Sequence, residues 1–294
     1  MTKIVKANEI ELPNIVMGCI YGCPGSGKST LALSAPKPLL IDTDGGVSRV
    51  QAEYRSDTVQ VKSYQDILDV FKEDLSEYES IIIDTLGELV NFMLKHFVDK
   101  DPGLMTRGGT MNIKVWGLVK TEFNSLKMTM RQLNKNLIFV AHQAEDKDGD
   151  KKVYRLDVAG SSGKDVVKIL DFLGYMEMVG KRRTISFAPS ERYYAKNSIK
   201  LDDMIQIPIL KEGTPNDFLF EQVIKPSIER RKTEQLEHAK EDKAIAEGRK
   251  PIGKDPNATL EAFKAMELSP YAKGVLFKEL CASTDLKWNG EKFA

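Results

Sequence analysis

Short apolar runs alternate with amphipathic stretches over the first two thirds of the chain. The runs at 15–21, 39–41 and 81–83 have the length and β-branched content of buried strands. Apolar residues recur at helical spacing over 64–77 and 86–97. Because strands and helices alternate in this way, the pattern predicts a mainly parallel sheet with helices on both faces.

The same pattern extends to about residue 210 and then becomes richer in strands. A short helix over 28–35 is stopped by Pro36 and Pro38. We expect a strand at 58–61 and a long helix at 113–133, followed by a strand at 137–140 and an exposed hairpin or loop over 144–163. Further short strands are predicted at 175–179, 184–187 and 205–209. The fold class is therefore α/β with a β-rich extension.

The composition changes after about residue 225. Residues 227–250 are mostly charged, which is typical of a solvated helix or connector, and residues 251–256 contain a proline at each end. Helical apolar spacing returns over 258–283. We expect an α/β core over 1–225, a charged helical linker over 226–256 and a small helical segment over 257–294.

Composition excludes several classes of protein. The chain has 294 residues, of which 41% are hydrophobic and 29% charged, so it is not a disordered protein. Its 43 basic and 43 acidic residues balance, so any nucleic-acid contact must use local patches. Three cysteines cannot form a disulfide framework, and no apolar run is long enough for a signal core or a membrane span. We expect a soluble protein of a bacterial or phage-infected cytoplasm, without a membrane partner.

One motif carries specific chemistry. Between the first strand and the following helix the chain matches G-x-x-x-x-G-K-[ST] in full, and this motif is the Walker A phosphate loop. Its glycines allow backbone N–H groups to surround a phosphate, its lysine reaches the β- and γ-phosphates, and its serine hydroxyl is suited to Mg²⁺. The expected ligands are ATP and Mg²⁺, held by Gly22, Cys23, Pro24, Gly25, Ser26, Gly27, Lys28, Ser29 and Thr30.

Carboxylates follow two of the buried strands. Asp84 ends the run 81–83, where a carboxylate beside a phosphate loop holds Mg²⁺ together with Ser29 (the Walker B role). Hydrolysis also needs a group that activates water, and Asp44 is the preferred base, with Asp42 as the alternative. Both aspartates also suit simple helix capping. His142, after the strand 137–140, is interpreted as a structural histidine, and with three histidines in all a zinc site is not expected.

The ordered motifs resemble those of the RecA-like recombinases, specifically short phage-encoded RecA-core proteins proposed to promote single-strand annealing. The resemblance covers about residues 12–210 and rests on the Walker motifs, the segment 42–44, the segment 137–143 and the segment 195–200. It implies that Asp44 is the catalytic carboxylate, although RecA has Glu there. It implies that Gln143 senses the γ-phosphate and that Lys196 reaches the nucleotide of a neighbouring subunit in a ring or filament.

The resemblance also places two DNA-binding loops. Residues 105–110 resemble the first loop, which makes Met105, Arg107 and Gly108 candidate contacts for single-stranded DNA. Residues 144–163 occupy the position of the second, but they are rich in acidic residues, and Lys152 is the candidate there. The basic run 181–183 and the tyrosines 193–194 fit either DNA contact or ordinary structural roles.

The function implied is an ATP-hydrolysing RecA-like protein that acts on single-stranded DNA in phage recombination or annealing, with a slow, DNA-stimulated turnover. A single-strand-binding protein is a further expected partner. Two alternatives remain open. A nucleotide kinase shares the phosphate loop but needs an arginine-bearing lid, for which 181–183 is the only support. An ATP-gated adaptor or helicase loader would use the charged linker and the C-terminal segment to dock its partner.

Overall fold

The computed structural model describes residues 5, 10, 12–106, 108–160, 162–248, 255–267, 269–283 and 288–291. The chain divides into two units. One consists of residues Pro13–Ile228, and the other consists of Met1–Leu12 together with Glu229–Ala294. The first unit contains the sheet and the segment 22–29 that matches the Walker A motif.

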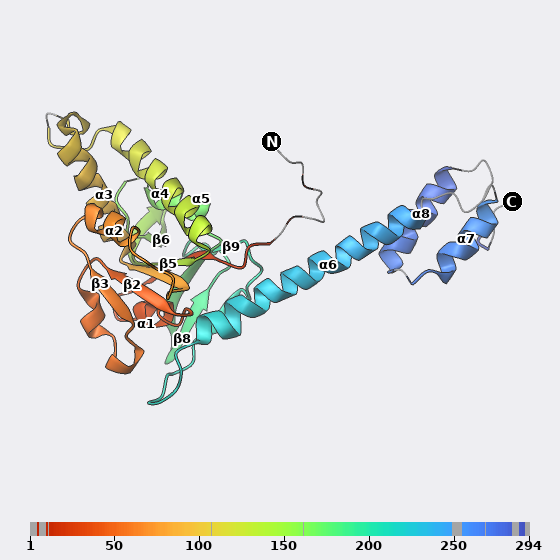
Figure 1. Ribbon diagram of the computed structural model, residues 1–294, viewed down its shortest axis with the longest axis horizontal. Coiled ribbons are helices and arrows are strands. Elements are labelled where there is room, and N and C mark those ends of the chain that lie inside the picture. The colour runs from red at the N-terminus through yellow and green to blue at the C-terminus, as the bar shows by residue number, and fades with distance from the viewer. Residues whose placement is uncertain are drawn as a thin grey trace. The chain divides into compact units, whose positions relative to one another are not determined.

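A ten-stranded sheet is the centre of the first unit (Figure 1). Its main path runs in the order β10-β8-β7-β1-β5-β4-β2-β3, with β6 paired to β5 and β9 paired to β7. The parallel strands are β1 (Met17–Gly22), β2 (Pro38–Asp42), β3 (Asp57–Gln60), β4 (Ser80–Asp84), β5 (Asn136–Asp148) and β7 (Phe172–Val179). The antiparallel strands are β6 (Lys151–Leu156), β8 (Arg182–Ser186), β9 (Lys196–Asn197) and β10 (Met204–Gln206). The predicted α/β class with a mainly parallel sheet is confirmed.

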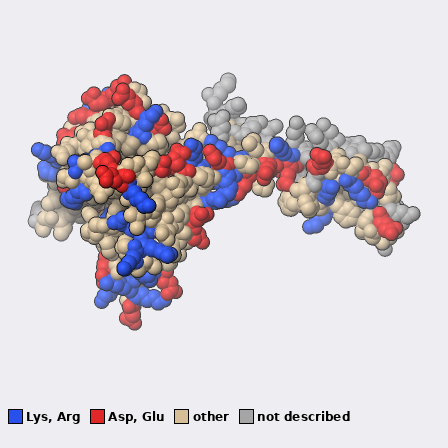
Figure 2. Space-filling model, turned by 90° about the horizontal axis from the view of Figure 1, so that it is seen from below, with Lys and Arg blue, Asp and Glu red and all other residues tan. Residues whose placement is uncertain are grey.

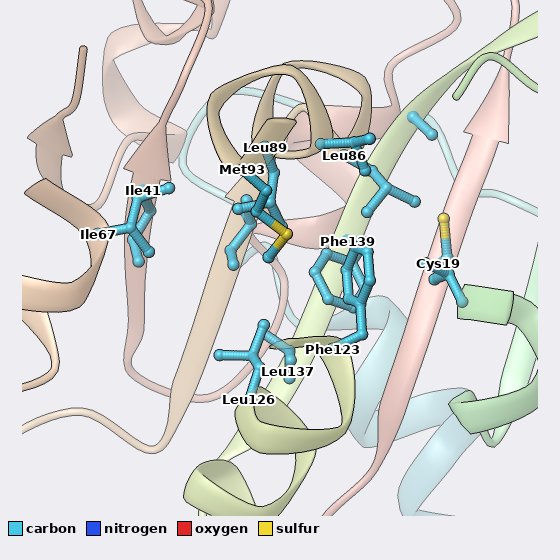
Figure 3. Close-up of a cluster of buried hydrophobic side chains, with 14 of the residues drawn as sticks. Cys19, Ile41, Ile67, Leu86, Leu89, Met93, Phe123, Leu126, Leu137 and Phe139 are labelled. Carbon is cyan, nitrogen blue, oxygen red and sulfur yellow. The ribbon is translucent and has the colours of Figure 1, made fainter. Parts of the chain in front are cut away.

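Helices cover both faces of this sheet. One face packs against α2 (Tyr64–Val70), α3 (Leu86–Lys100), α4 (Ile113–Leu133) and α5 (Ser162–Ile169). Figure 3 shows this core, in which Phe139 of β5 lies beside Phe123 of α4, with their ring centroids 6.1 Å apart. The other face packs against α1 (Lys28–Ala32) and the π-helix η5 (Phe218–Ile224). Successive strand residues alternate between the faces, so Ile138 and Val140 belong to the second core while Leu137 and Phe139 belong to the first.

Local signals set the helix ends. Ser63, Thr85 and Asn112 each accept a hydrogen bond from a backbone N–H in the first turn of α2, α3 and α4. Helix α4 ends at Asn134, whose φ of 51° is left-handed, and its bounds are those predicted. The predictions for α1 and α2 were too long, because these helices end at Ala32 and Val70. After Val70 the backbone makes local turns, such as Lys72 N–H to Asp69 O, while Leu75 still packs in the core.

The hairpin expected over 144–163 is present as the end of β5 paired with β6, with Gly149 in a left-handed turn. Two expectations in this region were wrong. Helix α5 (Ser162–Ile169) begins inside the segment expected to be a hairpin or loop, and it was not predicted. Strand β10 ends at Gln206, three residues before the predicted end, and residues 207–210 form a loop that is described with the site.

The second unit is helical. Helix α6 (Lys225–Gly248) runs into it from the last residues of the first unit, and α7 (Pro256–Ala265) and α8 (Pro270–Ala282) follow. Leu260 and Phe263 of α7 pack with Leu276 and Leu280 of α8 in a small core. Asp255 and Ser269 cap these two helices. Among the helices of the described residues, none is long and apolar enough to cross a membrane.

Candidate functional site

The Walker A sequence folds as a loop between β1 and α1. Gly25 and Gly27 have φ values of 74° and 96°, a left-handed conformation that glycine adopts at little cost. The carbonyl of Cys23 accepts hydrogen bonds from the Ser26 hydroxyl at 2.9 Å and from the Lys28 ammonium at 2.8 Å. The loop is therefore held in its curved shape by its own side chains, as a phosphate-binding loop requires.

Gly22, the first residue of the loop, packs closely against the backbone of β7. A Cβ atom at this position would lie 2.1 Å from the carbonyl oxygen of Met176 in β7, an atom that cannot move without disturbing the sheet. We expect Gly22→Ala to lower the free energy of unfolding by about 1–3 kcal/mol in urea denaturation. Gly117→Ala is the control, because nothing lies near its Cβ in α4, and it is expected to be stabilising. Equal stability of Gly22→Ala and wild type would contradict this close packing.

Lys28, Ser29 and Asp84 meet at the carboxyl ends of β1 and β4. The Ser29 hydroxyl donates a hydrogen bond of 2.5 Å to the Asp84 carboxylate. The neighbouring Thr43 N–H donates to the Asp84 carbonyl at 2.7 Å, and the Thr85 N–H donates to the Thr43 hydroxyl at 2.6 Å. These backbone contacts fix the end of β4 against the end of β2, so the Asp84 side chain has a set position beside the loop.

Burial changes the acid–base behaviour of this group of side chains. It raises the pKa of Asp84 to about 6, against the hydrogen bond from Ser29, which lowers it, and the charge of Asp44 raises it further. Burial also lowers the pKa of Lys28, an effect that the charge of Asp84 opposes. Both side chains are buried in the folded chain, so each charge depends on the other or on a ligand.

The two candidate bases occupy different positions. The buried carboxylate of Asp42 accepts hydrogen bonds from the N–H groups of Gly46 and Val47, so it caps the 3₁₀-helix η2 (Gly46–Arg49). Asp44 lines the cavity beside the phosphate loop, where its carboxylate lies 3.8 Å from Arg49 and also accepts from Gly46 N–H. Of the two, Asp44 alone is among the residues that line the cavity.

His142 and Gln143 end the buried part of β5 on opposite faces. His142 pairs in register with Gly22 and lines the cavity, and its Nδ1 is buried without a hydrogen-bond partner among the described residues. Burial, followed by the charge of Lys28, lowers its pKa, which favours the neutral imidazole. Gln143 does not line the cavity, and its side-chain oxygen is also buried without a partner. The structure thus places His142 at the site, although the sequence analysis interpreted it as a structural histidine.

A cavity of about 450 Å³ lies over the loop. Its polar lining includes Pro24, Gly25, Gly27, Lys28, Ser29 and Thr30 of the loop, with Asp44, Asp84 and His142. Its apolar lining includes residues 207–210 and Phe218, and Asn216 donates a hydrogen bond of 2.7 Å to the carbonyl of Thr30. A cavity lined by both charged and apolar residues suits a phosphorylated ligand with a flat apolar part.

A family model described as "AAA domain" matches residues 15–199, which include the phosphate loop, Asp44, Asp84 and His142. The chain belongs to this AAA domain family. Among solved structures, the chain is similar to the crystal structure of the RadB recombinase, with 17% identity over 58% of this chain and 79% of that chain and a TM-score of 0.37. No curated protein matches the chain.

The AAA domain has oxygen ligands suited to magnesium. Mg²⁺ prefers carboxylate, hydroxyl, phosphate and water oxygens, and it is usually bound through one or two protein groups plus substrate phosphates. Ser29 and Asp84 already contact each other through such oxygens. Among the described residues, no group of three or more His, Cys, Asp or Glu side chains could hold a metal ion by itself. The residues present therefore fit MgATP.

Lys196 of the AAA domain lies at the other end of the sheet. It pairs with Leu173 near the start of β7, whereas the phosphate loop follows the opposite ends of the parallel strands. Its ammonium donates hydrogen bonds to the carbonyls of Val167 and Lys168 at 3.0 and 3.1 Å, and so caps the end of α5. This position separates Lys196 from the phosphate loop of its own subunit.

The candidate DNA contacts occupy two separate places. Met105 and Met111 form a β-bridge at the base of the first loop, and Gly108 is exposed, while Arg107 lies outside the described residues. Lys152 is on β6, where its ammonium contacts Glu145 at 2.5 Å and lies 5.8 Å from the ring centre of Tyr154. Tyr193 stacks on Tyr175 in the core with ring centroids 4.4 Å apart, so of the two tyrosines Tyr194 has the exposed ring.

Proposed function

We propose that the protein is an ATPase that binds MgATP at the phosphate loop, hydrolyses it slowly and acts on single-stranded DNA in phage recombination or strand annealing. The observation that carries the proposal is that Lys28, Ser29 and Asp84 line one cavity, with Ser29 hydrogen-bonded to Asp84. Apolar residues of the lining such as Phe218 would accommodate the base. The expected compartment is the cytoplasm of a bacterium or of a phage-infected cell.

In the hydrolysis step, water attacks the γ-phosphorus, the bond to the β,γ-bridging oxygen breaks, and ADP and phosphate leave. Asp44 takes the proton of the attacking water, since its carboxylate lines the cavity whereas that of Asp42 is engaged in capping. Lys28 neutralises charge on the phosphates. Ser29 and Asp84 would hold Mg²⁺, which would offset the negative charge that develops on the γ-phosphate. Gln143 remains the proposed sensor of the γ-phosphate, acting through movement of β5.

Assembly supplies the remaining cation. Because Lys196 lies at the end of the sheet away from the phosphate loop, any nucleotide that it contacts belongs to a neighbouring subunit in a ring or filament. To do so it must exchange the carbonyls of α5 for phosphate. This arrangement would make turnover depend on assembly, and assembly on DNA would then stimulate turnover.

Met105, Arg107, Gly108 and Lys152 are the proposed contacts with single-stranded DNA. Figure 2 shows Lys and Arg interspersed with Asp and Glu on the face in view. The proposal depends on a few local cations. Lys152 is supported by its exposed position near an aromatic ring, but it must separate from Glu145 to reach phosphate. A single-strand-binding protein is proposed as a further partner.

The test measures retention of a labelled single-stranded oligonucleotide with MgATP, with a non-hydrolysable analogue and without nucleotide. We expect retention only with nucleotide, and we expect Asp44→Asn to bind MgATP as wild type does while its turnover falls about 100-fold. Asp42→Asn is the comparison, with lower stability as its main effect because a cap is lost. ATP turnover without any oligonucleotide retention would remove the DNA part of the proposal.

A further inference from the structure

Arg183 lies beside the phosphate loop although it is far from it in the sequence. A Cβ atom on Gly27 would be 3.6 Å from Arg183 Nε and 3.8 Å from its guanidinium carbon. Arg183 also lines the cavity together with Lys28 and Ser29. The guanidinium therefore lies at the cavity, next to the backbone of the phosphate loop.

The sheet fixes this position. Arg183 of β8 pairs with Met178 of β7, and its carbonyl accepts a hydrogen bond from Ile207 N–H at 2.9 Å. Met176 of β7 reaches Gly27 from the same side, with its terminal carbon 3.6 Å from the same Cβ position. Because β7 pairs directly with β1, the strand that leads into the loop, Arg183 is attached to the loop through the sheet of its own subunit.

The charge of Arg183 is available to a ligand. Three other arginines of the first unit contact carboxylates: Arg192 pairs with Glu177, Arg155 with Asp146, and Arg49 approaches Asp44. Over the described part of the chain, no acidic side chain forms an ion pair with Arg183. A guanidinium has five N–H donors in a planar arrangement that matches the oxygens of phosphate.

We propose that Arg183 is a phosphate-binding residue of the nucleotide site, acting within the same subunit. The inference rests on the proposed function, because it requires a nucleoside triphosphate at the phosphate loop. Arg183 would contact phosphate oxygens from the side opposite the carboxylates Asp44 and Asp84. Unlike Lys196, it needs no neighbouring subunit, so the unassembled chain already has a second cation for the triphosphate.

The first experiment measures the affinity for MgATP and MgADP by calorimetry in wild type, Arg183→Ala, Arg183→Lys and Arg182→Ala. We expect Arg183→Ala to weaken MgATP binding about tenfold or more, and Arg183→Lys to recover part of this loss, because it keeps the charge without the planar donors. Arg182→Ala is the matched control, since the preceding residue of a strand faces the other way, and we expect a change within about twofold. Thermal melting of each variant checks the fold.

The second experiment tests whether the residue acts in the same subunit. Arg183→Ala subunits, which keep the loop, are mixed with Lys28→Met subunits, which keep the arginine. We expect no recovery of tight MgATP binding, and recovery would overturn action within one subunit. If Arg183→Ala binds MgATP with wild-type affinity, the inference is overturned while the proposed function stands. This holds even if the variant no longer retains the oligonucleotide, a result that would assign Arg183 to DNA contact. Absence of nucleotide binding by wild type would instead overturn the proposed function.

Discussion

Replacing Lys28 with methionine is expected to lower the affinity for MgATP by about 100-fold, because charge-assisted hydrogen bonds to the phosphates are lost. The side chain is buried, and burial lowers its pKa, so the ammonium is costly to keep in the folded chain without an anion. Methionine has a similar length and removes this cost, but it also leaves the buried Asp84 carboxylate without its counter-charge, so the melting temperature should change little. Calorimetric titration with MgATP, together with thermal melting, measures both effects.

Lys37→Met is the matched control for this change. Lys37 is exposed and pairs with Glu79 at the surface, away from the cavity. Its replacement should leave nucleotide affinity as it is in wild type. Oligonucleotide retention in the presence of MgATP should disappear with Lys28→Met and persist with Lys37→Met. If Lys28→Met still binds MgATP normally, the loop is not a phosphate site in this protein.

Replacing Asp84 with asparagine is expected to have opposite effects on activity and stability. ATP turnover should fall about 100-fold, because a ligand of Mg²⁺ is weakened. The chain without nucleotide should become more stable at neutral and alkaline pH by about 1–3 kcal/mol, because a buried carboxylate no longer has to be charged. Turnover assays and urea denaturation measure the two effects separately.

The pH dependence of the stability gain follows from the pKa of Asp84. Because its pKa rises from 3.8 to about 6 on folding, the folded chain holds a proton between these values that the unfolded chain has released. The stability of wild type therefore decreases as the pH rises through this window, and the penalty is complete above it. The advantage of Asp84→Asn should be largest near pH 8 and much smaller at pH 4–5.

Asp69→Asn provides the comparison for this effect. Asp69 is exposed, and its hydrogen bond with Lys72 lowers its pKa, the reverse of the shift at Asp84. Its replacement should give no stability gain at pH 8 and no change in turnover. A stability gain for Asp84→Asn that does not depend on pH would show that the carboxylate charge is not its cause.

Much of the site could be predicted because its signals are local. The phosphate loop is a continuous segment between a strand and a helix, so its position relative to β1 and α1 follows from the chain itself. The carboxyl ends of parallel strands lie at one edge of a sheet, which placed Asp84 beside the loop and brought Asp44 into the cavity. The approximate range of helix α4 was also predicted, and in the structure the Asn112 cap and the left-handed Asn134 mark its ends.

The remaining features depend on tertiary contacts that no local signal marks. Helix α5 contains Val166 and Val167, which suit a strand, and it is helical because it packs against α4 in the core. Arg183 reaches the loop through the pairing of β8 with β7, which the sequence does not specify. His142 was within reach of prediction, because strand alternation from Ile138 and Val140 puts it on the face that carries α1.

The bond between the Lys28 ammonium and the Cys23 carbonyl has a consequence for recognition. Because Lys28 already has a partner within its own loop, an incoming phosphate replaces the Cys23 carbonyl as the hydrogen-bond acceptor. The lysine side chain does not have to become ordered when the phosphate binds. The contribution of Lys28 to the binding free energy is then the difference between its bond to phosphate and its bond to the Cys23 carbonyl. A weakly charged anion gains little from this exchange. The Cys23 carbonyl therefore competes with every anion for Lys28, and this competition favours strongly charged anions over weakly charged ones.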